Sequence, residues 1–335
     1  MRPSRGRLVA FLLLSVAQTL SAGVVHAAPF QLGDIFAAVG DSDLNGTSEV
    51  RRYNAAGVLQ ETLQLTGASN RSTGMAFDSA GNLYATGFDS NVVKKFDSNG
   101  ALLGNFGSGY ATPESIVFDN AGNVYVSNVS DGGIRKFDAA GNFITTILPG
   151  VRVDWMDLAA DQTTMLYSQE GSPILRVNVS TNTALSNFVA TGGLSFALRI
   201  LPDGSVLVAN GGNIKLYNSS AALVRTYDVA GEDLWFALNL NPDGTSFWSG
   251  NLQTGNLYEF DIACGFVANC TTFTQFLATG VPNQQPTRAL AGVAIFGERT
   301  VGCPTCFVPV AEPTSLALLG LGLTALATLA WRRRR

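Results

Sequence analysis

The sequence predicts an all-β fold built from a repeated unit of four short strands. Three observations support this: abundant glycine, short apolar runs between turn signals, and a recurrence every 40 or 41 residues. Of the 335 residues, 46% are apolar, only 14% are charged and 36 are glycine. The chain is therefore long enough for a large core, and its apolar runs are too short for helices.

The recurrence is clearest at the turn glycines. Gly81 and Gly122 lie 41 residues apart, Gly204 follows after two such periods, and Gly244 comes 40 residues later. The stretch 155–189 fills the missing period with a degenerate turn. Self-similarity at this spacing is typical of repeat architectures.

Each unit contains four apolar runs. In the second unit these are Met75–Phe77, Leu83–Gly87, Val92–Phe96 and Leu102–Phe106, and turn dipeptides such as Asn99-Gly100 separate them. Four antiparallel strands in about 40 residues make a β-propeller blade. One such sheet cannot bury both of its faces, whereas in a ring each blade covers its neighbour.

The two ends of the repeat region predict how the ring closes. The first unit, from Gly33, lacks a first strand, and Ala289–Glu298 reads as a first strand without a unit. Joining the two completes one blade and gives six in all, over residues 30–299. A solenoid is the alternative, but a split blade argues for a ring.

The repeats resemble the NHL-type and gluconolactonase-like propellers, which share the rhythm "FD-x-x-GN-x-Y" found here in Gly33–Glu298. The resemblance implies the fold. It leaves the function open, because propellers include binding proteins, lactonases and lyases. In the gluconolactonase-like enzymes, acidic and amide residues around the central channel hold a divalent cation.

The residue before each first strand is expected at one mouth of that channel. Stepping by the period gives Thr73, Glu114, Trp155, Phe196, Phe236 and Ala291. One carboxylate among three aromatics departs from the metal-lactonase pattern, since hard cations need several oxygen ligands. Glu114 and Asp154 remain candidate ligands. The aromatic rings either stack on a sugar or apolar ligand or pack the channel.

The stretch "GDSDLNGTSE" at Gly40–Glu49 has a calcium-like pattern. Asp41, Asp43 and Asn45 are spaced as at the start of an EF-hand loop, with Glu49 as a further acidic residue. Glu49 comes at the ninth position instead of the twelfth, and strands are expected on both sides. Ca²⁺ is therefore a candidate ligand, and an Asp- and Asn-rich hairpin loop is the alternative.

The N-terminus predicts a secretory signal peptide over residues 1–27. Arg2, Arg5 and Arg7 precede an apolar run at Leu8–Leu20, and small residues allow cleavage after Ala27. An uncleaved anchor is the alternative. Cleavage removes the single histidine, which argues against triads and metal sites that need imidazole.

Processing at both ends makes the exported body strongly acidic. The signal peptide and the C-terminal arginines carry seven of the 21 basic residues, which leaves a net charge near −11, or −10 if Glu312 is also removed. An acidic body argues against nucleic acid and anionic lipid surfaces as partners.

Four cysteines remain in the exported chain. The pairs Cys264–Cys270 and Cys303–Cys306 are expected as local disulfides. The alternatives are a four-thiolate zinc site, which the spacing fits poorly, and a redox function for the C-x-x-C pair.

The C-terminal part divides into a linker with a sorting motif, 300–313, and a transmembrane helix with a basic end, 314–335. The apolar run Leu316–Trp331 precedes Arg332, Arg333, Arg334 and Arg335. Arginines stay on the cytoplasmic side, so the propeller is placed outside the inner membrane. A permanent tail anchor is the alternative to removal of this segment.

This tail resembles the PEP-CTERM sorting signal of Gram-negative bacteria, with Val310, Ala311, Glu312 and Pro313 in place of Val-Pro-Glu-Pro. The resemblance implies recognition by an exosortase, removal of the helix and release to the cell surface or an exopolysaccharide matrix. The expected function is non-catalytic binding of a glycan, another ligand or a surface protein. A metal-dependent lactonase or hydrolase that uses Glu114 is the alternative.

Overall fold

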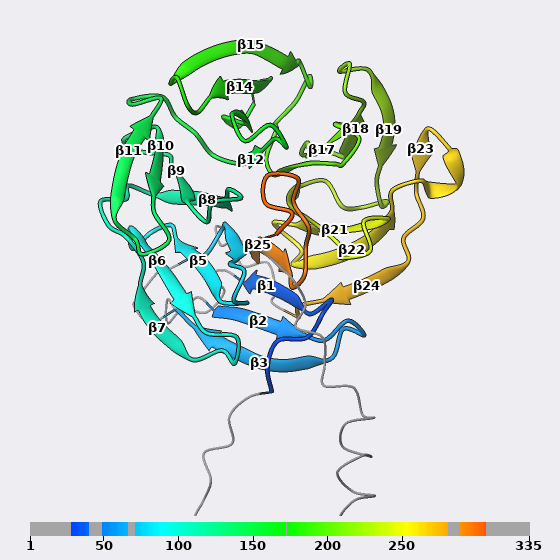
Figure 1. Cartoon of the computed structure of the whole chain (residues 1–335). Coiled ribbons are helices and arrows are strands. Elements are labelled where there is room, and N and C mark those ends of the chain that lie inside the picture. The colour runs from blue at the N-terminus through cyan, green and yellow to red at the C-terminus, as the bar shows by residue number, and fades with distance from the viewer. Residues whose placement is uncertain (1–27, 40–48, 66–70, 172, 281–288, 306–335) are drawn as a thin grey trace, which may run out of the picture.

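The computed structural model confirms a six-bladed β-propeller (Figure 1). It describes residues 28–39, 49–65, 71–171, 173–280 and 289–305. The blade that closes the ring is formed, in spatial order, by β25 (Leu290–Ile295), β1 (Ile35–Val39), β2 (Glu49–Tyr53) and β3 (Leu59–Gln64). The split blade predicted from the two ends of the repeat region is therefore present.

Five further blades follow in chain order. The second and third consist of β4 (Met75–Phe77), β5 (Leu83–Gly87), β6 (Val92–Phe96), β7 (Leu102–Asn105), and β8 (Pro113–Phe118), β9 (Val124–Asn128), β10 (Ile134–Phe137), β11 (Phe143–Ile147). The fourth and fifth consist of β12 (Met156–Leu158), β13 (Thr164–Tyr167), β14 (Ile174–Asn178), β15 (Thr183–Val189), and β16 (Leu198–Ile200), β17 (Val206–Ala209), β18 (Ile214–Tyr217), β19 (Leu223–Tyr227). The sixth consists of β20 (Trp235–Leu240), β21 (Ser246–Asn251), β22 (Asn256–Asp261) and β24 (Gln275–Ala278).

The repeated "FD-x-x-GN-x-Y" motif forms the turn between the first two strands of a blade. In the third blade the Oδ1 atom of Asp119 accepts hydrogen bonds from the backbone amides of Ala121 and Asn123, at 3.0 and 2.9 Å. The Tyr125 hydroxyl donates to Oδ2 of Asp119 at 3.2 Å. Gly122 has a φ of 79°, a conformation that other residues rarely adopt. The motif recurs because its Asp, Gly, Asn and Tyr residues all take part in this turn.

Burial falls from the first strand of a blade to the fourth. All residues of β8 and β20 are buried, whereas most of β7 and β15 is exposed. This gradient is expected where inner strands pack around a central channel and outer strands face water.

A fifth strand in one blade was not predicted. The connection between β22 and β24 contains a one-turn 3₁₀ helix, η1 (Cys264–Phe266), and β23 (Asn269–Cys270), and β23 pairs in parallel with β19. This segment protrudes beyond the ring at the right of Figure 1. The Cys264–Cys270 disulfide closes it, with a Cα–Cα distance of 6.0 Å. The predicted pairing of these two cysteines is confirmed.

The chain after β25 covers one mouth of the central channel. Gln162 donates a hydrogen bond from Nε2 to the Gly302 carbonyl at 2.7 Å, and the Cys303 sulfur lies 3.2 Å from the Asp119 carbonyl oxygen. Both partners lie just beyond the ends of first strands. The segment 296–305, orange in Figure 1, lies over the centre of the ring. We call residues 296–305 the plug.

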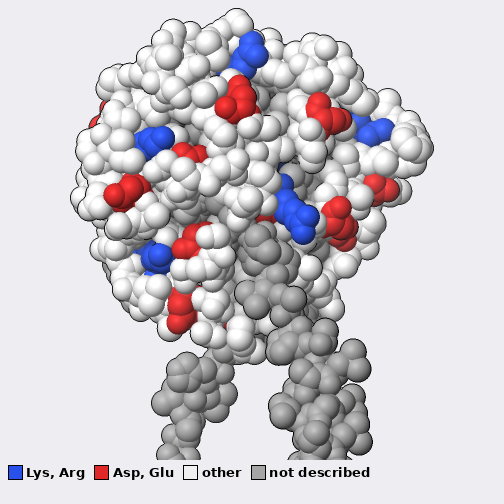
Figure 2. Space-filling model, viewed as in Figure 1, with Lys and Arg blue, Asp and Glu red and all other residues white. Residues whose placement is uncertain are grey.

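Several predictions concern residues outside the described ranges: the signal peptide, the loop with Asp41, Asp43 and Asn45, and the tail from residue 306 onward. Among the residues that the structure describes, no helix is long and apolar enough to cross a membrane. The face seen in Figure 2 carries acidic and basic side chains scattered singly among uncharged ones, without a basic patch.

Candidate functional site

The channel has two different mouths. The plug covers the mouth at which the first strands end, which we call the capped mouth. The first strands begin at the other, where the predicted mouth residues Thr73, Glu114, Trp155, Phe196, Phe236 and Ala291 are all buried. Glu114, Phe236 and Ala291 lie inside first strands instead of just before them. The ladders are irregular at Pro113/Ile116 and Trp235/Ala237, which explains this difference in position.

The aromatic residues of this mouth pack against one another. The Phe236 ring lies 5.5 Å from that of Trp155 and 4.9 Å from that of Phe196, measured between centroids. Their exposed fractions are 1%, 3% and 6% in that order. The rings therefore belong to the core in this conformation and offer no open face for stacking on a sugar.

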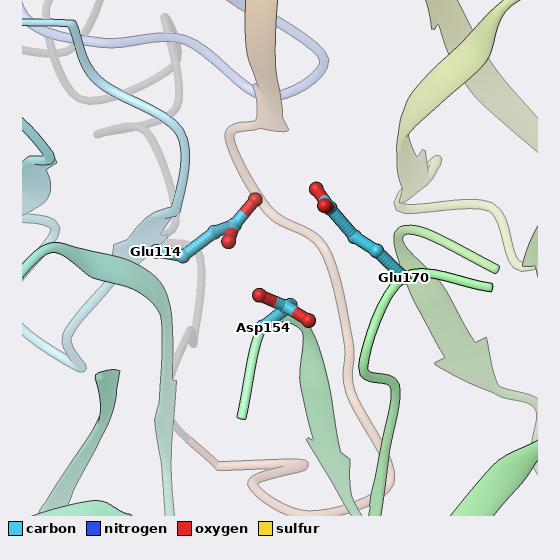
Figure 3. A group of neighbouring side chains, drawn as sticks. All are labelled: Glu114, Asp154 and Glu170. Carbon is cyan, nitrogen blue, oxygen red and sulfur yellow. The ribbon is translucent and has the colours of Figure 1, made fainter. Parts of the chain in front are cut away.

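Three carboxylates gather at the same mouth. Glu114 on β8, Asp154 just before β12 and Glu170 after β13 each bring an oxygen within 4.8 Å of the others. Figure 3 shows the three side chains converging from different segments. We call Glu114, Asp154 and Glu170 the acidic cluster and the end of the channel at which they lie the acidic mouth. Asp154 and Glu114 were candidate ligands from the sequence, whereas Glu170 was missed.

Hydrogen bonds between blades hold the backbone of the acidic cluster. The Thr73 hydroxyl donates to the Glu114 carbonyl at 2.8 Å. The Ser127 hydroxyl donates to the Asp154 carbonyl at 2.5 Å and accepts from the Ser115 amide at 2.8 Å. The bonds from Thr73 and Ser127 join adjacent blades, and together they fix the backbone positions of Glu114 and Asp154 relative to each other.

Arg152 is the cation that faces the acidic cluster. Its Nε lies 2.8 Å from Oδ1 of Asp154, and one terminal nitrogen lies 2.7 Å from Oε2 of Glu170. Gln169 donates to the Arg152 carbonyl at 2.8 Å. The Arg152 side chain is 44% exposed and that of Glu170 29%, so this pair forms the outer layer over two buried carboxyls.

Burial and mutual repulsion alter the acidity of the cluster. Burial, followed by the charges of Asp154 and Glu170, raises the pKa of Glu114 well above its usual value. Burial also raises the pKa of Asp154 to about 6, although Arg152 acts in the opposite direction. Glu114 therefore releases its proton at a higher pH than an exposed glutamate does, and the group resembles an acid–base pair below an ion pair.

The donor set of the acidic cluster is compatible with a hard divalent cation. Carboxylate oxygens are the ligands that Ca²⁺ and Mg²⁺ prefer. A cation there would compete with the proton on Glu114 and with Arg152, which already contacts two of the three carboxylates. Metal binding at this position should therefore strengthen as pH rises.

The remaining candidate residues lie elsewhere. Glu49, the described member of the calcium-like loop, begins β2 and forms an ion pair with Arg51. Cys303 is disulfide-bonded and 3% exposed, while Cys306 lies outside the described residues. The calcium site and the Cys303–Cys306 pairing stay predictions.

Comparison with protein families identifies the C-terminal segment. Residues 309–335 match the family described as the PEP-CTERM protein-sorting motif. The chain carries a PEP-CTERM motif. This confirms the resemblance drawn from Val310–Pro313 and the terminal arginines. The PEP-CTERM motif is the recognition signal for exosortase processing and implies export with membrane-anchored sorting in Gram-negative bacteria.

Solved structures resemble the propeller that precedes the PEP-CTERM motif. A chain in the crystal structure of a nidogen/laminin complex is 13% identical, with a TM-score of 0.62 and coverage of 79% of this chain and 99% of that one. A streptogramin B lyase structure is also 13% identical, with a TM-score of 0.54 and coverage of 79% and 89%. No curated protein sequence matches the chain. At these identities the likeness shows the fold alone.

Proposed function

We propose that this protein is displayed at the cell surface or in an exopolysaccharide matrix, where its propeller binds a glycan, another ligand or a surface protein without catalysis. The observation that carries the proposal is the PEP-CTERM motif at 309–335, which follows a complete propeller after a short linker. Exosortase recognition and release of the tail belong to the same proposal.

The acidic mouth is the binding region in this proposal. Its outer layer offers the guanidinium of Arg152, the carboxylate of Glu170 and the amide of Gln169. Such groups bind hydroxyls and amides by hydrogen bonds, which suits a polar glycan or a peptide backbone. The buried aromatic rings contribute by holding this mouth rigid.

Retention on isolated exopolysaccharide tests this function. Exchange of Arg152 and Glu170 for glutamine should weaken retention, because it removes charged hydrogen-bonding groups and leaves the buried pair in place. The matched control is Arg176→Gln, whose guanidinium bonds Ser186 on an outer strand. Retention that is equal for all three proteins would contradict binding at the acidic mouth.

A metal-dependent lactonase or hydrolase is the second candidate, and the convergence of Glu114, Asp154 and Glu170 favours it. In that case a bound divalent cation would polarise the substrate carbonyl. Lactone turnover that depends on Ca²⁺ or Zn²⁺ and is lost in Glu114→Gln would support this candidate over the first. Inertness with both metals would count against it.

A further inference from the structure

We infer that the capped mouth faces the membrane during sorting and that the acidic mouth points away from it. The plug is the feature that carries this inference, because it fixes where the chain leaves the propeller. The inference rests on the proposed membrane insertion of the tail, and it adds an orientation that the PEP-CTERM motif does not specify.

The plug is held firmly at the centre of the capped mouth. Glu298 accepts hydrogen bonds at Oε1 from Nε of Arg199 at 2.9 Å and from the Leu240 amide at 2.8 Å. Arg199 lies on the first strand of the fifth blade and Leu240 ends that of the sixth. The plug is thus attached to two blades at its beginning.

The far end of the plug contacts two other blades. Gly302 lies so close to the end of β12 that an added Cβ atom would stand 2.6 Å from the Leu158 carbonyl oxygen. Cys303 is buried against the third blade. Thr305, the last residue described, is exposed just after this contact. The chain therefore departs from the middle of the capped mouth and not from the rim.

The tether between this point and the apolar segment is short. Ten residues separate Thr305 from Leu316, and fully extended they reach at most about 40 Å. A folded domain as long as the propeller, residues 30–299, has a radius of gyration of about 18 Å and a width of about 46 Å. The path over its surface from one mouth to the other is then about 70 Å.

These lengths decide the orientation. A tether of about 40 Å cannot bring the opposite pole of a body about 46 Å wide against the bilayer in which the tether ends. It does allow tilting about the capped mouth. The acidic mouth is consequently presented to the surroundings, and a partner reaches Arg152 and Glu170 without passing the membrane.

Labels at the two ends of one blade test the inference in the full chain. Ala121→Cys lies in the turn between β8 and β9, on the capped side, and Asp131→Cys lies between β9 and β10, on the acidic side. Each protein, labelled with a fluorophore, is reconstituted in vesicles containing a headgroup-linked quencher. We expect quenching at position 121 to exceed that at position 131 about twofold or more, given the width of the body.

A control variant carries about 40 Gly/Ser residues inserted after Val308, between Cys306 and the sorting motif, which extends the reach beyond 100 Å. Its two labels should be quenched alike. Equal quenching in the natural-length protein that floats with vesicles would overturn the orientation and leave membrane insertion intact. Failure of the protein to float with vesicles would overturn both insertion and the orientation.

Discussion

Arg199 and Glu298 form an ion pair that is almost completely buried, with 2.9 Å between Nε and Oε1 and side-chain exposures of 6% and 11%. The pair joins the fifth blade to the plug. The Asp157 carboxylate also lies in the field of Arg199. One guanidinium therefore compensates two acidic groups, one in the plug and one on the first strand of the fourth blade.

Replacement of this arginine should loosen the plug. Arg199→Met leaves Glu298 without its cation in a buried position, which typically costs about 3–5 kcal/mol of stability. Urea unfolding measures the loss, and trypsin cleavage after Arg299 reports release of the plug. Arg176→Met, on β14 of the fourth blade and away from the plug, is the control and should change neither quantity. A native trypsin pattern in Arg199→Met would contradict the attachment described here.

Stability should fall as the pH rises from about 4 to 7. Burial raises the pKa of Asp157 to about 6 and acts on Asp154 in the same way. A carboxyl whose pKa is higher in the folded than in the unfolded state binds more protons when the protein is folded. Its contribution to the free energy of unfolding is therefore greatest in acid and is lost as the pH rises through the folded-state pKa. For Asp157 the loss is about 3 kcal/mol. Thermal unfolding across this range measures it.

The acidic cluster has a matching variant for that experiment. Glu114→Gln removes a carboxyl whose pKa is raised by burial and by its two acidic neighbours. The melting temperature of this variant should depend less on pH than that of the natural protein. An unchanged pH profile would show that Glu114 does not titrate with the cluster.

Ring closure should be sensitive to one glycine. An added Cβ atom at Gly292 on β25 would lie 2.1 Å from the Thr73 carbonyl oxygen of the next blade. Gly292→Ala therefore forces the first strands of two blades apart, with an expected cost of about 1–3 kcal/mol. Gly212→Ala, where nothing lies within 4 Å, is the control. Equal midpoints of urea unfolding would contradict tight packing at this contact.

The Cys264–Cys270 disulfide should stabilise the sixth blade and its contact with the fifth. A loop of this size is expected to contribute about 2 kcal/mol through the unfolded state. The double variant Cys264→Ser/Cys270→Ser should lose that amount in urea unfolding and should expose β23 to hydrogen exchange. Unaltered exchange at Asn269 and Cys270 would show that the pairing with β19 does not need the bridge.

Sequence periodicity predicted most of the ring because the turn motif repeats a full set of interactions. The runs Met75–Phe77, Leu83–Gly87 and Val92–Phe96 coincide with β4, β5 and β6. The pairing of β23 with β19 was missed because it is non-local and follows from an insertion without a repeat. A two-residue strand carries no periodic signal of its own.

The acidic cluster was only half predicted, for a different reason. Glu114 stands at a position reached by stepping with the period, and Asp154 directly precedes the next such position, Trp155, so the period leads to both. Glu170 lies after the second strand of its blade and has a φ of 44°. The sequence pattern alone does not indicate that this part of the chain points toward the channel. The presence of Glu170-Gly171 in a turn was the available signal.

The pairing of β25 with β1 also determines when the ring can close during export. The ring cannot shut until Ile295 meets Ile35, its partner in the ladder, and in an exported chain those residues cross the membrane at opposite ends of the process. Until then the other five blades remain without a complete closing blade, because β25 crosses the membrane only just before the tail. Completion of the fold and arrival of the sorting motif thus become nearly simultaneous events, and folding is tied to the end of translocation.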